Sequence, residues 1–152
     1  MIVDVPGYQP ISLKNLVLDF TGTLSKDGVL LDGVESRLSE LSKTVHIVVL
    51  TADTFGTAAK ALEGLPVELK IINSGKEKAD YVERVGAASV AAIGNGRNDV
   101  PMCRVAALSV AVMGPEGVAS ELLRSVHIVV PNICDALDLL AMPLRVRATL
   151  RD

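Results

Sequence analysis

Aromatic residues are scarce in this chain of 152 residues, where they make up 3% and tryptophan is absent. Hydrophobic residues as a whole reach 49%, so a core has to be built from valine, leucine, isoleucine and alanine. Such a composition is typical of a parallel sheet that helices cover on both faces. The length suits one domain, which needs no disulfide or structural metal for stability. We therefore expect residues 1–152 to form a single α/β domain.

Cysteine is nearly absent as well. Cys103 and Cys134 are the two in the chain, and their spacing matches no metal-binding motif. Reduced thiols of this kind are usual in the cytosol. The sequence begins without a basic leader, and no uncharged apolar run approaches the roughly 18 residues of a membrane span. We expect a soluble cytoplasmic protein without a membrane partner.

A basic surface is lacking too. The net charge is -3, and the 15 lysines and arginines are scattered along the chain. Binding to nucleic acid requires these residues to gather on one face. The sequence therefore predicts no nucleic-acid partner.

Short apolar runs alternate with amphipathic stretches, which is the pattern of repeated βα units and a mainly parallel sheet. We predict strands at residues 13–18, 45–50, 67–72, 89–93, 109–112 and 127–130, and helices at residues 34–42, 55–62, 76–85, 100–105, 117–124 and 134–141. Asp27-Gly28, between apolar residues, predicts a small β-hairpin after the first of these strands. The tail at residues 145–151 alternates basic and apolar residues. It is expected to be an edge strand or a subunit contact, with a frayed terminus as the alternative.

Asp19 directly follows the apolar run Leu16-Val17-Leu18. Open parallel sheets place their ligands at this end of a strand. The next residues, Thr21-Gly22-Thr23, allow a sharp turn and offer N–H and hydroxyl groups to an anion. This stretch therefore predicts a site for phosphate chemistry.

Three later stretches fall at the same expected edge of the sheet. Thr51 ends the second strand and is followed by the N–H groups of a helix start, such as that of Ala52, which can bind a phosphoryl oxygen. Alternatively, Thr51 or Asp53 is simply a helix cap. A cation has to balance the nucleophile and the phosphate, and Lys76 and Lys78 are both candidates.

The fourth stretch is Gly94-Asn95-Gly96-Arg97-Asn98-Asp99, a glycine-rich turn that opens a helix. Together the four stretches resemble the motifs of the haloacid dehalogenase (HAD) superfamily. The Asp19 stretch is most similar to the phosphorylation motif of P-type ATPases, and Lys78-Ala79-Asp80-Tyr81-Val82 resembles a helix start in those ATPases, which favours Lys78 over Lys76. The resemblance implies a Rossmann-like three-layer sandwich with a small hairpin flap and no cap domain.

The resemblance also implies that Asp19 is a nucleophile that becomes an aspartyl-phosphate. The implied roles are catalysis by Asp19, Thr21, Thr51 and Lys78, phosphate binding by Gly22, Thr51, Ala52, Lys78 and Asn98, and binding of Mg²⁺ by Asp19, Thr21, Asn95 and Asp99.

Two residues depart from the family pattern. Family phosphatases usually carry a second aspartate, a general acid and base, where this chain has Thr21. Asn95 stands where the family has the first carboxylate of the acidic motif. We therefore expect slow turnover and weakened binding of Mg²⁺.

The prediction for function is a magnesium-dependent phosphohydrolase that acts on a phosphorylated small molecule or a phosphoprotein. The alternative is a regulatory module whose weakened site binds phosphate, metal or a partner chain. A receiver domain would need an acidic pair on the first strand, and Val17-Leu18 offers none. Without a cap the site is expected to be open. The resemblance then implies that the protein acts on macromolecules or shields the site in a dimer or tetramer, as capless superfamily members do.

Overall fold

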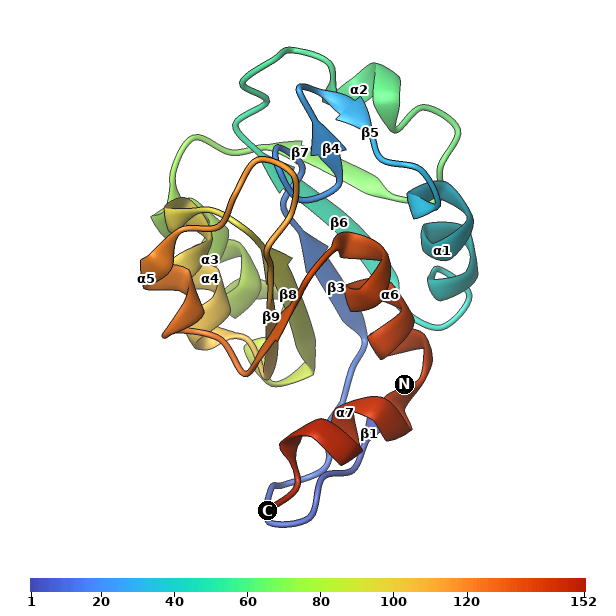
Figure 1. Ribbon diagram of the computed structural model, residues 1–152, viewed down its shortest axis with the longest axis vertical. Coiled ribbons are helices and arrows are strands. Elements are labelled where there is room, and N and C mark those ends of the chain that lie inside the picture. Colours follow the sequence, from blue (N-terminus) through green and yellow to red (C-terminus); the bar gives the residue numbers. More distant parts are fainter.

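The computed structural model describes residues 1–152, and a six-stranded parallel sheet lies at its centre (Figure 1). The strand order is β10-β9-β8-β3-β6-β7, and every neighbouring pair is parallel. The strands are β3 (Asn15–Leu18), β6 (His46–Thr51), β7 (Glu68–Ile71), β8 (Val90–Gly94), β9 (Leu108–Val112) and β10 (Ile128–Val130). All six predicted strands are confirmed, as is the parallel arrangement.

Helices cover both faces of this sheet. Along β3, Leu16 and Leu18 point into one hydrophobic core and Val17 points into the other. Alternation of this kind follows from the twofold side-chain period of a strand. The helices on the first face are α1 (Val34–Leu41) and α6 (Ile133–Ala141), and those on the second are α3 (Gly75–Val85), α4 (Val100–Val105) and α5 (Ser120–Leu123). The predicted three-layer α/β architecture is therefore confirmed.

The flap is an antiparallel hairpin of β4 (Ser25–Lys26) and β5 (Val29–Leu30) directly after β3. It lies beside α2 (Ala58–Ala61) at one end of the molecule (Figure 1). The hydroxyl of Thr57 donates to the carbonyl of Gly28 over 2.7 Å, which ties the flap to the loop after β6. Only this hairpin and α1 separate β3 from β6, so no cap domain is present, as expected.

Two helices are shorter than the sequence predicted. Positive φ angles of 66° at Gly56 and 88° at Gly117 exclude these residues from an α-helix. Consequently α2 begins at Ala58 and α5 begins at Ser120. Two short 3₁₀ segments, Ala87–Ser89 and Arg97–Asp99, precede β8 and α4.

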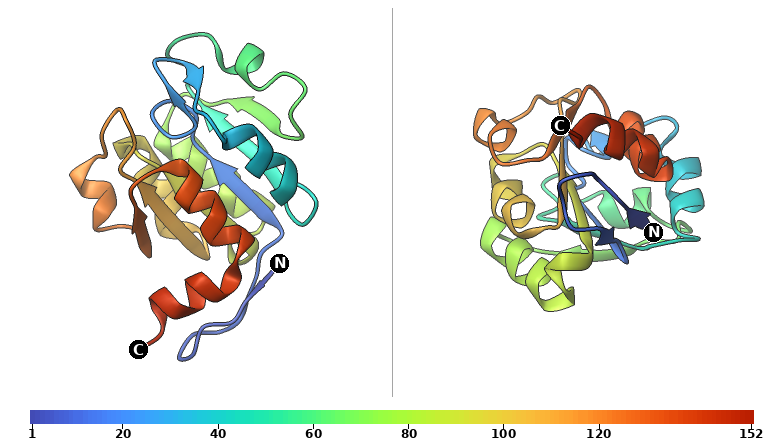
Figure 2. Two further views of the ribbon diagram at one scale, coloured as in Figure 1. Left: turned by 45° about the vertical axis from the view of Figure 1, so that its right-hand side comes forward. Right: turned by 90° about the horizontal axis from the view of Figure 1, so that it is seen from below.

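The expectation of an extended or frayed C-terminal tail was wrong, because residues Pro143–Leu150 form helix α7. Pro143 stands in the first turn, where proline suits a helix. Val146 is fully buried, and Arg147 pairs with Asp4 over 3.1 Å. The helix thus packs beside a hairpin that the sequence did not predict, β1 (Ile2–Val3) with β2 (Ile11–Ser12), at the end opposite the flap (Figure 2). None of the helices has the length and apolar character needed to cross a lipid bilayer.

Two leucines of the C-terminal helices test the position of the core. Leu137 on α6 is fully buried, whereas Leu144 on α7 is 74% exposed. We expect Leu137→Ala to lower the free energy of unfolding by about 2–5 kcal/mol, since it removes buried methyl groups and leaves a cavity. Leu144→Ala, the matched control, should change it by less than about 0.5 kcal/mol. Urea denaturation measures both, and equal losses would contradict the described core.

Candidate active site

Asp19 extends β3 by one residue and then the chain turns sharply. Its N–H donates to the carbonyl of Ile93 over 3.0 Å, which keeps it in line with β8. The carbonyl of Phe20 then accepts the N–H groups of Thr23, Leu24 and Ser25 at 3.2, 2.9 and 3.1 Å. This turn holds the Asp19 side chain, 4% exposed, at the carboxyl edge of the sheet.

Gly22 makes the turn possible. Its φ is 76°, and a Cβ on this residue would lie 2.4 Å from Nδ2 of Asn95. Any other residue would be strained by this φ and would require the Asn95 side chain to move. The N–H of Gly22 donates to the carbonyl of Ser25 over 3.1 Å, so the predicted phosphate contact would require this bond to be given up.

Lys78 reaches Asp19 from the first turn of α3. The hydroxyl of Ser74 caps this helix by accepting the N–H of Glu77 over 3.2 Å. Nζ of Lys78 lies 2.6 Å from Oδ1 of Asp19 and the side chain is fully buried. Lys76 instead points into solvent and pairs with Asp80 over 2.6 Å. Of the two candidate lysines, the structure brings Lys78 to Asp19.

Asp99 is the second partner of Lys78. Its Oδ1 lies 2.7 Å from Nζ, and its Oδ2 accepts the N–H groups of Asn95 and Gly96 over 3.1 and 2.9 Å. The side chain is fully buried. A metal bound by Asp99, as the sequence predicted, would have to displace one of these bonds. The geometry favours a role in holding Lys78.

Two carboxylates therefore share one buried ammonium. Burial raises the pKa of Asp19 from 3.8 to about 7, and the charge of Asp99 adds to this effect, whereas Lys78 and Thr23 oppose it. Burial acts to lower the pKa of Lys78, but the charges of Asp19 and Asp99 outweigh it, so this pKa is raised. Lys78 stays protonated, and once Asp19 is ionised, above about pH 7, the two carboxylates outweigh this single positive charge and favour a cation beside them.

Side-chain oxygen atoms of Thr21, Thr23 and Asn95 lie near Asp19 and are possible ligands for a metal ion. The hydroxyl of Thr23 lies 3.1 Å from Oδ2 of Asp19 and 3.1 Å from Oδ1 of Asn95. Nδ2 of Asn95 donates to the carbonyl of Gly117 over 3.0 Å, which orients the amide so that its oxygen points toward Thr23. The hydroxyl of Thr21 is buried and has no hydrogen-bond partner. Oxygen donors of this kind suit a hard cation such as Mg²⁺. No group of three or more histidine, cysteine or acidic side chains is arranged to hold a metal.

Thr51 and Ala52 lie where the sequence placed them, at the end of β6. Oγ1 of Thr51 accepts the N–H of Asp53 over 2.9 Å, and the residue is 1% exposed. Oδ1 of Asp53 accepts the N–H groups of Thr57 and Ala58 over 3.0 and 3.1 Å. The N-cap position of α2 is Thr57, and Asp53 supports the helix start from the preceding loop. The proton of the Thr51 hydroxyl remains available to a ligand.

These residues surround a small polar hollow of about 230 Å³. Its walls are Asp19, Thr21, Thr51, Ala52, Thr54, Asn95, Gly96, Asn98 and Glu116. The sequence had not singled out Thr54 or Glu116. Glu116 follows β9, and its place after a strand of the same sheet was the signal that could have found it.

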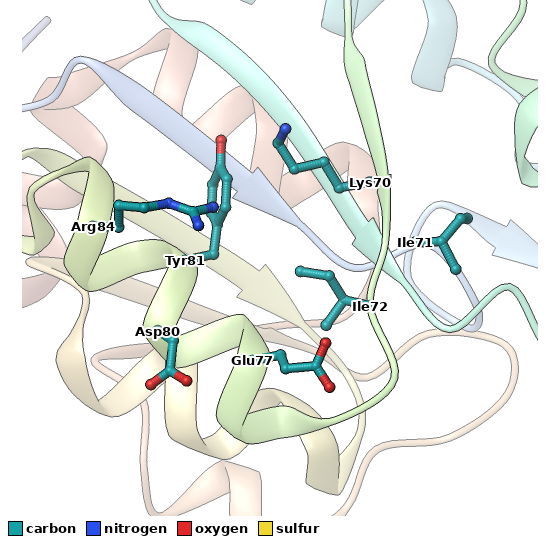
Figure 3. Close-up of a pocket in the computed structure, with 7 residues that line it drawn as sticks. All are labelled: Lys70, Ile71, Ile72, Glu77, Asp80, Tyr81 and Arg84. Carbon is teal, nitrogen blue, oxygen red and sulfur yellow. The ribbon is translucent and has the colours of Figure 1, made fainter.

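A larger hollow, of about 550 Å³, lies on the outer side of α3 beside the edge strand β7 (Figure 3). Tyr81 forms part of its wall, and the cations of Lys70 and Arg84 lie 5.7 and 5.1 Å from the centre of the Tyr81 ring. Lys78, also on α3, does not line this hollow and reaches Asp19 instead. None of the predicted site residues lines this larger hollow.

Comparison with known proteins begins with sequence. No known family profile matches the chain. It is 48% identical over 63 residues to the uncharacterized protein MJ0073 of Methanocaldococcus jannaschii, a match that covers 41% of this chain and 68% of that protein. The chain belongs to the same family as MJ0073.

Solved structures give the fold. A Streptomyces avermitilis protein assigned as a HAD family hydrolase superposes with a TM-score of 0.68 at 21% identity, over 87% of this chain and 84% of that one. The 3-deoxy-D-manno-octulosonate 8-phosphate phosphatase of Moraxella catarrhalis, in complex with magnesium, phosphate and KDO, has a TM-score of 0.65 at 13% identity, over 86% and 87%. A zinc-transporting PIB-type ATPase has a TM-score of 0.65 at 26% identity over 79% of this chain, which spans 20% of that ATPase chain. The fold is that of the HAD superfamily.

The raised pKa of Asp19 makes stability depend on pH. The folded state holds this proton more tightly than the unfolded state does, so the stability that Asp19 contributes is full below about pH 3.8 and is lost as the pH rises toward about 7. Asp19→Asn removes this dependence. We therefore expect the free energy of unfolding of Asp19→Asn, minus that of the original chain, to increase as the pH is raised from about 3.8 to about 7 in metal-free buffer. Urea denaturation at several pH values measures it, and a constant difference would contradict the described burial.

Proposed function

We propose that residues 1–152 form one hydrolase domain that removes phosphoryl groups through an aspartyl-phosphate on Asp19. The observation that carries this proposal is the Asp19 carboxylate itself. It lies in the wall of a polar hollow and is hydrogen-bonded to the buried ammonium of Lys78 at 2.6 Å. A carboxylate that faces a ligand-sized space while a fixed cation balances charge is suited to attack on phosphorus.

The reaction has two displacements. In the first, an oxygen of Asp19 bonds to phosphorus while the bond to the leaving oxygen breaks, and that oxygen takes the electron pair and then a proton from solvent. In the second, a water oxygen bonds to phosphorus and the bond to Asp19 breaks. Lys78 balances the charge of the phosphoryl group, and the Thr51 hydroxyl donates to one of its oxygens. The N–H of Ala52 and the amide of Asn98, in the walls of the hollow, are further donors.

The Asp19 carboxylate, the Thr21 carbonyl and the Asn95 amide oxygen are the groups that would hold Mg²⁺. When bound, the ion neutralises charge on the phosphoryl oxygens. Since Asn95 replaces a carboxylate of the family pattern, affinity should be modest. Asp99 serves this site by positioning Lys78.

The rate of hydrolysis is expected to be low because of Thr21. A threonine cannot protonate the leaving oxygen, and loss of such an acid commonly costs about 10²–10⁴ in rate. Substrates with good leaving groups, such as aryl phosphates, should therefore react faster than alkyl phosphates.

The substrate class follows from the open hollow. With no cap over it, a phosphorylated small molecule fits, as does a phosphorylated segment of a protein. A dimer or tetramer that shields the site remains a prediction, which a mass measurement in solution tests.

Thr21 and Asn95 also support a second candidate function, a regulatory module that binds phosphate or metal without turnover. Beryllofluoride, which mimics a phosphoryl group on aspartate, separates the two. Binding of beryllofluoride without any hydrolysis would favour the module.

The nucleophile gives the first test of the proposed function. We expect Asp19→Asn to abolish release of p-nitrophenol from p-nitrophenyl phosphate in the presence of Mg²⁺, because an amide cannot form the covalent intermediate. The control is Asp32→Asn, an exposed aspartate outside the hollow, which should keep full activity. An Asp19→Asn variant as active as the original chain would refute the proposal.

The metal site gives a second test, with no need for turnover. We expect Asn95→Asp to bind Mg²⁺ about tenfold more tightly, because about 1.4 kcal/mol of added attraction to the ion corresponds to a tenfold change in affinity. The Mg²⁺ concentration that gives half of the maximal thermal stabilisation should fall by the same factor. Without Mg²⁺ the variant should melt earlier, because it loses the hydrogen bond to Gly117. Asn132→Asp lies outside the hollow and serves as control. An unchanged Mg²⁺ requirement would remove Asn95 from the metal site.

A further inference from the structure

The walls of the hollow contain few groups that can move a proton. Of the nine residues, Asp19 and Glu116 carry the only ionisable side chains, and the others are threonine, asparagine, alanine and glycine. Asp19 is committed to phosphorus in the proposed reaction. Hydrolysis of the aspartyl-phosphate still requires a water molecule to lose a proton. Glu116 is the one remaining group in the walls that can take it.

The turn that carries Glu116 is held in place at its ends. The N–H of Gly117 donates to the carbonyl of Gly114 over 3.1 Å, so Pro115 and Glu116 are the two central residues of a β-turn. Proline at the first central position restricts the backbone further. The closed turn therefore fixes the backbone from which the Glu116 side chain extends.

This turn packs directly on the nucleophile loop. A Cβ on Gly114 would lie 2.7 Å from the carbonyl oxygen of Gly22, so the two backbones touch at this point. On the other side, Asn95 donates from Nδ2 to the carbonyl of Gly117 and accepts the N–H of Ala119 over 2.8 Å. Asp19, Asn95 and Glu116 are thus brought to one hollow by backbone contacts.

Glu116 is also free to act. It forms no ion pair, whereas the nearby Glu121 is paired with Arg97 over 3.1 Å. Its side chain is exposed, so a proton that it accepts can pass to bulk water. A carboxylate in the wall of the hollow also repels a phosphoryl group.

We infer that Glu116 is the general base for hydrolysis of the aspartyl-phosphate, an inference that rests on the proposed function. A water oxygen bonds to phosphorus, and the electron pair of the breaking P–O bond returns to the Asp19 carboxylate. The water proton goes to Glu116 and from there to solvent. The acid-base group missing at Thr21 is thereby supplied by the loop after β9, for the second displacement only.

The test follows the phosphoenzyme directly. The full chain is labelled with acetyl [³²P]phosphate and Mg²⁺, then chased with unlabelled reagent, and the decay of the acid-stable label is timed. We expect Glu116→Gln to form phosphoenzyme at an unchanged rate and to slow its decay by at least about tenfold, since a general base commonly contributes 10²–10⁴. Glu116→Asp should recover part of the rate. The KM of the Gln variant should stay equal or fall, because a repulsive charge is gone.

The outcomes separate the inference from the proposed function. Glu63→Gln, an exposed glutamate outside the hollow, should behave as the original chain. Normal decay in Glu116→Gln would overturn the role of Glu116 and leave the phosphohydrolase intact. Equal slowing of formation and decay would mean a structural disturbance and would also overturn it. If the original chain forms no more label than Asp19→Asn, the proposed function fails and the inference falls with it.

Discussion

The rest of the site depends on one buried ion cluster, in which Lys78 lies between Asp19 and Asp99 at 2.6 and 2.7 Å. Burying an ammonium is costly unless carboxylates and hydrogen bonds compensate it. Here the partners come from β3, α3 and the turn after β8, so the cluster joins three segments that are distant in sequence. Because two carboxylates meet one ammonium, the cluster carries surplus negative charge once Asp19 is ionised, and this charge favours a cation beside it.

Backbone contacts between loops keep this cluster facing an open hollow. Gly22 leaves room for Asn95, and Asn95 in turn is bonded to the loop that carries Glu116. Preorganised donors of this kind suit the proposed reaction, because they would stabilise developing charge without having to reorganise. Relative to the family pattern, Thr21 removes an acid-base group and Asn95 removes a negative charge. In the proposed role, Glu116 would supply the acid-base group from another loop. The negative charge lost at Asn95 would not be replaced.

Much of the fold could be predicted from the sequence, because apolar runs of strand length indicate strands that are buried on both faces of a parallel sheet. All six central strands were predicted on this basis, and the flap hairpin was predicted from the turn signal Asp27-Gly28. Helix α7 was missed because Arg145-Val146-Arg147 alternates as a strand would. Only the packing of Val146 and the pairing of Arg147 with Asp4 show why this segment is helical. The local sequence pattern does not predict the secondary structure of a short segment when a long-range contact determines which of its faces is buried.

For the candidate site, the sequence by itself determined that Asp19, Thr51 and the turn at Asn95 would meet, because the carboxyl ends of parallel strands share one edge. Tertiary structure alone decided that Asp99 faces Lys78 and that Glu116 reaches the hollow. It also placed against Asp19 the lysine that the resemblance had favoured. Each of these depends on how a helix is rotated or where a loop lies against its neighbour. Such details are set by packing between segments far apart in the chain, which no local run of residues encodes.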